Sequence, residues 1–298
     1  MGIPENQLET WSHQGSVQQS SSTYATVKNA LEATGSAYAE KDYSVFLQGS
    51  YCNDTNVYSE SDVDVVIQLD SVFHHDLDVE ALPPAPKAAF KTAYSDATYT
   101  HAHFKGDVVK QLEKVFGASA KPGTKAIKIE ASGNRRSADV LVTTKFRRYH
   151  RFVSTSDERY DEGICFFTSS GTRIANYPKQ HSANCTAKHQ AADSWYKPTV
   201  RIFKNLRRKL VADGVIASGI APSYYIEGLL YNVPKERFGG SYASTVANCL
   251  DFIAKADRSK FLCANEQYYL LRDDPNVTWS AANCEAFLAA AVDMWNKW

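Results

Sequence analysis

The chain has 298 residues, 44% of them hydrophobic and 22% charged, which suits one large domain or two modest lobes. Its 33 Lys and Arg balance its 33 Asp and Glu, and this neutrality argues against a protein that grips long duplex DNA or RNA through many phosphates. No apolar run approaches the roughly 18–20 residues of a membrane-spanning helix, so no membrane association is expected.

The N-terminal residues and the cysteines indicate a cytoplasmic protein. The first residues have neither the basic nor the apolar region of a secretory signal. The six cysteines include no C-x-x-C pair and no histidine at zinc spacing, and a chain of this length needs no disulfides to fold. We therefore expect reduced thiols in a cytoplasm.

Apolar spacing predicts the first elements of the chain. A three- and four-residue repeat predicts a helix from about residue 22 to residue 38, capped by a serine at 21 or 22. Residues 43–47 and 62–69 predict two strands, since apolar and polar side chains alternate in the second. Residues 70–103 are rich in proline and histidine and predict an irregular surface insertion.

A helix, a hairpin and then several more helices follow. Residues 107–116 predict a helix that ends at Gly117 in a left-handed conformation, and residues 125–130 and 137–143 predict a hairpin around Gly133-Asn134. Beyond residue 177 the strand patterns stop and only helical patterns remain. These later helices are expected at about residues 198–212, 222–233, 241–256 and 280–298.

The pattern as a whole predicts an α+β protein with two lobes and a central cleft. The first half mixes strands and helices, and the second half is all helical. We place the boundary so that residues 1–176 form a catalytic core with an N-terminal helix and residues 177–298 form a helical lobe. A cleft between two such lobes is a natural place for a ligand.

Three aspartates are the candidate catalytic residues. Asp62 and Asp64 are two residues apart on a strand, so both side chains point to the same side. Asp139 lies within an apolar strand that could run beside the first. Three carboxylates would then converge at one end of a sheet, although a bare Asp-x-Asp pair also occurs by chance on solvated strands.

Carboxylates held close together repel one another unless a cation lies between them. Magnesium prefers oxygen ligands and is commonly held by one or two carboxylates together with substrate phosphates. Two such ions can activate an attacking hydroxyl and stabilise the leaving oxygen of an in-line displacement. The three aspartates therefore predict a site for two magnesium ions, or for manganese in their place.

A turn before the second strand supports this chemistry. Gln48, Gly49 and Ser50 follow the first strand and precede Asp62 by a short segment. Glycine has no Cβ, so the backbone N–H groups and the serine hydroxyl of such a turn can approach a phosphate closely. A strand, a Gly-Ser turn, Asp-x-Asp and a later aspartate together predict a nucleotidyltransferase.

This combination resembles a known family. The stretch Leu47-Gln-Gly-Ser-Tyr51 with Ser61-Asp-Val-Asp-Val-Val66 is similar to the motif of polymerase-β-like enzymes in their cGAS/DncV-like branch, the CD-NTases. Further stretches across nearly the whole chain resemble clade E of that family, including Asn176-Tyr-Pro-Lys-x-His181, Phe203-Lys-Asn205 and Pro222-Ser-Tyr224. The resemblance implies a polymerase-β-like core, an OAS/PAP-like helical lobe and the synthesis of cyclic nucleotide signals in bacterial anti-phage (CBASS) systems.

The resemblance also implies roles for single residues. Asp62, Asp64 and Asp139 match the metal-binding triad, and Gln48 and Ser50 match the turn at the donor triphosphate. Four further positions in the second half of the chain match nucleotide contacts. Lys204 and Ser223 match phosphate contacts, and Tyr224 or Tyr225 matches a residue that stacks on a base. Lys188 also matches a nucleotide contact, although the residues around it depart from the family pattern. Ser223 is by default also a helix N-cap, and Lys204 is expected at the edge of the core with access to the cleft.

Asn176 matches a base-pocket position where asparagine is associated with uracil. By this analogy the substrates would be UTP and ATP, or UTP alone, and the product cyclic UMP–AMP or cyclic di-UMP. A monomer is expected, with no nucleic-acid template, whose product a separate CBASS effector would read. The alternatives are a template-independent nucleotidyltransferase acting on RNA, protein or a small molecule, and a nucleotide sensor without catalysis.

Overall fold

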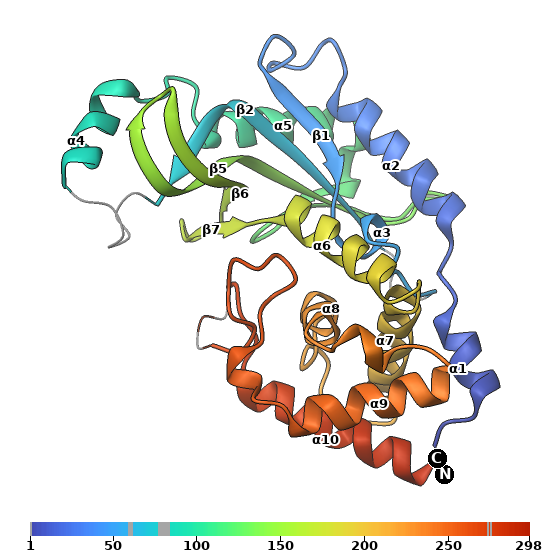
Figure 1. Cartoon of the computed structure of the whole chain (residues 1–298). Coiled ribbons are helices and arrows are strands. Elements are labelled where there is room, and N and C mark those ends of the chain that lie inside the picture. Colours follow the sequence, from blue (N-terminus) through green and yellow to red (C-terminus); the bar gives the residue numbers. More distant parts are fainter. Residues whose placement is uncertain (1, 59–61, 77–83, 273, 275) are drawn as a thin grey trace. The chain divides into compact units, whose positions relative to one another are not determined.

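The computed structural model describes residues 2–58, 62–76, 84–272, 274 and 276–298 (Figure 1). The chain divides into two compact units. The sheet unit comprises Gln19–Leu47 and Asp62–Tyr177, and the helical unit comprises Met1–Gln18, Gln48–Ser61 and Pro178–Trp298. The expected α+β class is confirmed.

In the described residues of the sheet unit, seven strands form one sheet in the order β1-β2-β5-β4-β3, which β6 and β7 extend from β5 (Figure 1). The strands are β1 (Tyr43–Leu47), β2 (Val63–His75), β3 (Ala120–Pro122), β4 (Ile127–Ile129), β5 (Ala138–Ser154), β6 (Asp157–Phe167) and β7 (Arg173–Asn176). The central pair, β2 and β5, is parallel, and the other neighbouring pairs are antiparallel.

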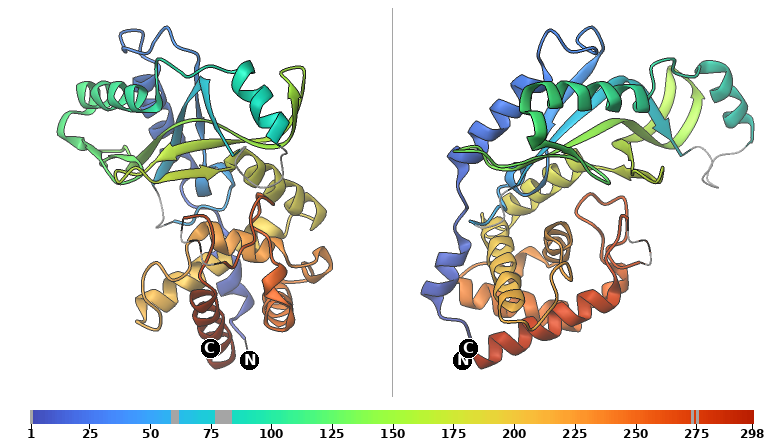
Figure 2. Two further views of the ribbon diagram at one scale, coloured as in Figure 1. Left: turned by 90° about the vertical axis from the view of Figure 1, so that its left-hand side faces the viewer. Right: turned by 180° about the vertical axis from the view of Figure 1, so that it is seen from behind.

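Strand alternation decides which face of this sheet is covered. Val63, Val65 and Ile67 are fully buried and pack with helices α2 (Val17–Leu31) and α5 (His101–Phe116). Figure 2 shows these two helices, blue and green, along one face of the sheet. The residues between them in β2, beginning with Asp64, therefore point to the opposite face.

The predicted insertion at residues 70–103 is wrong for its described parts. β2 continues to His75 after a bulge, because Asp70, Ser71 and Val72 are extra residues relative to β5. Helix α4 (Pro84–Ala93) follows and packs against β5. Residues 77–83 lie outside the described residues.

Helix boundaries in the sheet unit differ from the predicted ones at the N-terminal ends. α2 spans Val17–Leu31, so a serine at 21 or 22 does not cap it and Tyr38 lies beyond it. α5 begins at His101 rather than near residue 107, because Thr100 and His103 form a reciprocal cap. Its predicted end is confirmed, since Gly117 has a φ of 56°. The predicted hairpin is confirmed as β4 and β5.

The helical unit is built around α7. Its helices are α1 (Glu5–Ser12), α3 (Gly49–Cys52), α6 (Pro178–Ala191), α7 (Tyr196–Ala212), α8 (Ser223–Tyr231), α9 (Tyr242–Lys255) and α10 (Ala281–Lys297). Two short 3-10 helices, Lys235–Arg237 and Arg258–Lys260, also belong to this unit, and a third, Gly117–Ser119, follows α5 in the sheet unit. Val200, Phe203 and Leu206 form the predicted buried stripe of α7, and α1, α6, α8, α9 and α10 pack against that helix.

Two segments belong to a different unit from the one the sequence indicates. Residues 1–18 and 48–61 pack with the helical unit, whereas the predicted boundary placed them with the strands. Polar contacts with α7 explain this for α1, because Arg201 Nε donates to Ser12 O and Asn205 Nδ2 donates to Trp11 O at 2.9 Å. The last change of unit along the chain lies between Tyr177 and Pro178.

All six cysteines are free thiols. Within the part of the chain that the structure describes, none of the helices has both the length and the apolar character that crossing a bilayer requires.

Two histidines of the sheet unit are held as neutral rings. His101 Nε2 lies 3.0 Å from Val142 O, and because a carbonyl only accepts, this nitrogen donates. His74 Nδ1 lies 2.8 Å from Thr144 Oγ1. Burial lowers the pKa of both rings, and the neighbouring His101 and Arg173 help to lower that of His74 to about 4. Both are therefore neutral near pH 7.

This lowered pKa predicts acid sensitivity. An unfolded chain binds a proton at histidine near pH 6.5, so the stabilisation from neutral His74 is complete above that pH and is lost as the pH falls toward 4. In His74→Gln, we expect the free energy of unfolding to fall less between pH 7 and pH 5 than in the wild type, measured by urea unfolding. The exposed His13→Gln is the control, and an unchanged pH dependence in His74→Gln would contradict the prediction.

Candidate active site

The aspartates lie on the two parallel central strands. Asp64 in β2 and Asp139 in β5 are direct partners in the register, so the expectation that β5 runs beside β2 is confirmed. Asp62 immediately precedes β2, and its Oδ1 accepts a hydrogen bond from Ser137 Oγ just before β5. The three residues thus lie together at the N-terminal ends of the two central strands, which form one edge of the sheet.

The charges at this edge affect one another. Burial raises the pKa of Asp139, the charge of Asp62 raises it further, and Lys128 lowers it. Asp62 is exposed and Asp64 is half-buried, so this edge is accessible to solvent. A cation placed beside Asp139 would stabilise its charged form against both burial and the charge of Asp62.

The carboxylate oxygens of the three aspartates suit magnesium, which completes its coordination with water and substrate, better than they suit a metal whose ligands all come from the protein. Within the described residues, the one set of three ligand-type side chains whose donor atoms lie within 4.8 Å of one another is His181, Cys185 and Glu227, not the aspartates. Magnesium keeps several waters and takes substrate phosphate oxygens, so it needs only one or two carboxylates nearby. The all-oxygen set on β2 and β5 meets that requirement.

The Gly-Ser turn belongs to the helical unit. Gln48 follows Leu47 in the chain and is extended, and Gly49 then adopts a φ of 70° before the short helix α3. A side chain at position 49 would cost roughly 1–2 kcal/mol in this left-handed region. Gln48 Oε1 is buried with no hydrogen-bond partner among the described residues.

Lys204 lies beneath this turn. The side chain is fully buried, and its ammonium donates to Ser50 Oγ at 2.7 Å and to Thr55 O at 2.9 Å. The expectation of a lysine at the edge of the core is therefore wrong. Because Ser50 Oγ accepts from Lys204, its own O–H is directed elsewhere and remains available as a donor.

A buried carboxylate that the sequence analysis missed binds the same loop. Glu227 of α8 is 2% exposed and accepts from Thr55 Oγ1 at 2.5 Å, Asn53 Nδ2 at 3.0 Å and His181 Nε2 at 2.6 Å. Burial opposes charge on both Glu227 and His181. Cys185 and Glu227 nevertheless raise the pKa of His181 to about 10, and His181, Lys204 and Thr55 keep the pKa of Glu227 low. The sequence does contain one indication of this buried carboxylate, because Glu227 is the one acid within the otherwise apolar stretch 226–230.

The remaining predicted contacts of the helical unit all have protein partners. Ser223 is the first residue of α8, with Pro222 at the N-cap, so the N-cap expectation is wrong; its Oγ accepts from Arg207 Nη1 at 3.4 Å. Tyr224 stacks on His181 with ring centroids 4.6 Å apart. Lys188 donates to Val233 O, which favours a structural role for this lysine.

Asn176 ends β7 in the sheet unit. Its Oδ1 accepts the backbone N–H of Tyr177 at 2.8 Å, which fixes the orientation of the amide because that N–H needs an acceptor. No described residue accepts a hydrogen bond from Asn176 Nδ2. The side chain therefore presents a donor, and its oxygen is already engaged.

The chain is similar to known nucleotide-joining enzymes over its whole length. Residues 183–296 match the cGAS/DncV-like nucleotidyltransferase C-terminal helical domain. The sequence is 40% identical to Cyclic UMP-AMP synthase of Rhodothermus marinus (strain SG0.5JP17-172), over 100% of this chain and 99% of that protein. It is 35% identical to Cyclic nucleotide synthase CdnE01 of Staphylococcus haemolyticus, over 100% of both.

A solved structure agrees with these sequence matches. The Rhodothermus marinus CdnE c-UMP-AMP synthase with Apcpp and Upnpp superposes with a TM-score of 0.89 and 38% identity, over 99% of this chain and 97% of that chain.

Proposed function

The chain belongs to the cGAS/DncV-like nucleotidyltransferases, the CD-NTases, and we propose that it joins UTP with ATP, or with a second UTP, into a cyclic dinucleotide. The observation that carries this proposal is the direct pairing of Asp64 and Asp139 on parallel strands in a chain 40% identical to a cyclic UMP-AMP synthase. Each joining step would form a bond from a ribose hydroxyl to an α-phosphate and release pyrophosphate. The second step would close the ring.

The aspartates supply the cation-binding part of this chemistry. Asp62, Asp64 and Asp139 would hold two magnesium ions, for which manganese can substitute. When bound, these ions activate the attacking hydroxyl and neutralise charge on the leaving group. The raised pKa of Asp139 is consistent with this assignment, because burial first and the charge of Asp62 second disfavour its carboxylate, and a bound cation would offset both effects.

The turn supplies donors for the triphosphate. Gly49 leaves the backbone N–H groups of the turn accessible, and Ser50 would donate its hydroxyl to a phosphate oxygen while Lys204 donates to Ser50 Oγ. Gln48 would donate from its amide nitrogen. Lys204 thus acts through Ser50 in this proposal. Tyr224 has a different role: one face of its ring stacks on His181, and the other face would stack on a nucleotide base.

The product would be a signal read by a separate effector in an anti-phage system, as the family resemblance implies. The direct test is incubation of the purified chain with the four NTPs and magnesium, followed by mass spectrometry of phosphatase-resistant products. A cyclic dinucleotide containing uridine is expected. Linear extension of an added RNA primer, with no cyclic product, would instead support the template-independent alternative.

Asn176 predicts which base is chosen. Its free amide donor suits the O4 acceptor of uracil, so Asn176→Asp would place a carboxylate oxygen against O4. We expect kcat/KM for UTP to fall by about 10- to 100-fold, because an unpaired buried polar group costs about 1–3 kcal/mol. CTP, whose N4 is a donor, should be favoured instead.

The matched control is Asn134→Asp in the exposed hairpin turn, which should leave base preference unchanged. Competition between equal concentrations of UTP and CTP measures the preference in one reaction. Unchanged uridine incorporation in Asn176→Asp would remove Asn176 from the base pocket.

A further inference from the structure

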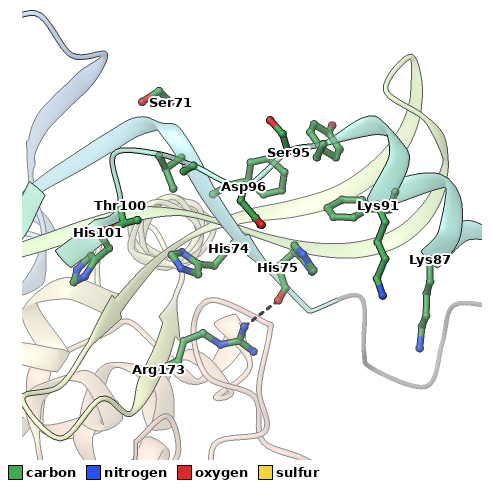
Figure 3. A pocket seen from close by; sticks show the side chains of 15 residues that line it. Ser71, His74, His75, Lys87, Lys91, Ser95, Asp96, Thr100, His101 and Arg173 are labelled. Carbon is green, nitrogen blue, oxygen red and sulfur yellow. Dashed lines mark hydrogen bonds between the residues drawn. The ribbon is translucent and has the colours of Figure 1, made fainter. Parts of the chain in front are cut away.

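A cavity of about 990 Å³ lies in the sheet unit away from the aspartates (Figure 3). The end of β2, helix α4, the segment between α4 and α5, and Arg173 of β7 form its walls. His74 and His75 of this cavity pair with Phe146 and Arg147 of β5, seven and eight residues beyond the Asp64–Asp139 pair, which corresponds to about 23–26 Å along the strand. The cavity is therefore separate from the proposed catalytic edge.

Fixed aromatic side chains form one wall. Phe73, Phe90 and Tyr94 pack against one another, with ring centroids 4.8–6.2 Å apart. Arg147 lies over the Phe73 ring at 4.2 Å and donates to Tyr94 Oη at 3.1 Å. Because α4 is attached to the sheet by this cluster, the wall is a packed surface rather than a loose loop.

The rim of the cavity is cationic. Lys87 and Lys91 are one turn apart on α4 and point downward in Figure 3, where Arg173 lies to their left with its guanidinium directed toward His75. Neither lysine has an ion pair or a hydrogen bond to any described residue. Arg173 Nη1 donates to His75 O at 3.1 Å, which leaves its other N–H groups for a ligand. The acid that lines the described cavity is Asp96, so three fixed positive charges face one negative charge.

Uncharged polar residues also line the cavity. His101 donates from Nε2 to Val142 O, so Nδ1 of the neutral ring is an acceptor. Thr100 and Ser95 add hydroxyl groups to the lining. Such a set of donors and acceptors matches the edge of a heteroaromatic ring better than it matches an aliphatic anion.

From these features we propose that the cavity binds a second nucleotide-class ligand, meaning a planar heteroaromatic ring that carries a phosphate. The phosphate binds at Lys87, Lys91 and Arg173, and the ring lies along Phe73 and Tyr94. The volume is at the upper end of the roughly 300–1,000 Å³ that small-molecule sites occupy. This site is additional to the nucleotides that react.

Equilibrium dialysis of the whole protein tests the proposal. The protein is first saturated with non-hydrolysable ATP and UTP analogues and is then titrated with radiolabelled AMP or UMP. We expect one further equivalent to bind. In the double variant Lys87→Glu/Lys91→Glu, the dissociation constant should rise by at least about tenfold, since a hydrogen bond to a charged group contributes about 1.5–3 kcal/mol.

Lys110→Glu on α5 is the matched control, because Lys110 is 79% exposed and lies outside the cavity lining. It should bind the labelled nucleotide as the wild type does, and thermal unfolding should verify that all variants are folded. No further equivalent, or one that the double variant retains, would overturn the proposal. Binding of a short RNA without any binding of a mononucleotide would also overturn it. None of these results depends on turnover.

Discussion

Replacing Asp62 and Asp64 together by Asn is expected to lower the rate of cyclic dinucleotide formation by at least about 1000-fold. The two substitutions remove two of the three carboxylates at the sheet edge, and with them the charge that would hold the cations. Metal ions of this kind contribute several kcal/mol to the transition state, and each 1.36 kcal/mol corresponds to a factor of ten. Product formation in single-turnover reactions with magnesium is the measurement.

Asp70→Asn is the matched control for this result. Asp70 is on the same strand, but it accepts from Gln68 and pairs with Lys145 at 3.6 Å. Its replacement should leave the rate of the folded protein within about twofold, because Asp70 already has protein partners and is not one of the three aspartates proposed to hold the cations. If the doubly substituted Asp62/Asp64 protein folds and still makes product, these residues do not bind the catalytic cations.

Among the substitutions considered, Glu227→Ala is expected to lower the free energy of unfolding the most. It leaves His181 Nε2, Thr55 Oγ1 and Asn53 Nδ2 buried without their acceptor. Breaking a buried pair by removing one partner costs about 3–5 kcal/mol. At about 2–4 °C per kcal/mol for a chain of this size, the melting temperature should fall by roughly 6–20 °C, measured by differential scanning calorimetry.

Two further variants separate the charge of Glu227 from its shape. Glu227→Gln keeps an acceptor for Thr55 and should lose less stability than Glu227→Ala. Glu9→Ala, at an exposed position of α1, should leave the melting temperature unchanged. Because the Glu227 network holds the loop after Ser50, KM for the nucleotides should rise in Glu227→Gln at a temperature where it is folded. Equal stability of Glu227→Ala and Glu9→Ala would show that the network contributes little.

The parts of the fold that could be predicted are those that local periodicity determines. β1 and the start of β2 follow from alternation over five to eight residues, and the apolar stripe of α7 follows from helical spacing. The pairing of Asp64 with Asp139 was also foreseeable, because both lie in apolar strands that need a neighbour. These features position the candidate catalytic residues.

The contacts that hold the Gly-Ser turn could not be predicted in this way. Glu227 binds Thr55 and Asn53 across 172 and 174 residues of sequence, and no local pattern encodes such a pairing. α4 was missed because prolines at its start resemble a loop, although proline is tolerated in the first turn of a helix. The burial of Lys204 was missed because lysine is almost never buried unless it is paired.

The order of the segments that make up the two units limits how the protein can be divided into separately expressed fragments. Residues 1–18, 48–61 and 178–298 make up one unit, so the polypeptide passes between the units four times. A fragment of residues 178–298 would contain every helix from α6 to α10 but would lack Ser50, Thr55 and Asn53. The ammonium of Lys204 and the carboxylate of Glu227 would then be left in an apolar interior without these partners. The helical half is therefore inseparable from a loop encoded more than a hundred codons upstream.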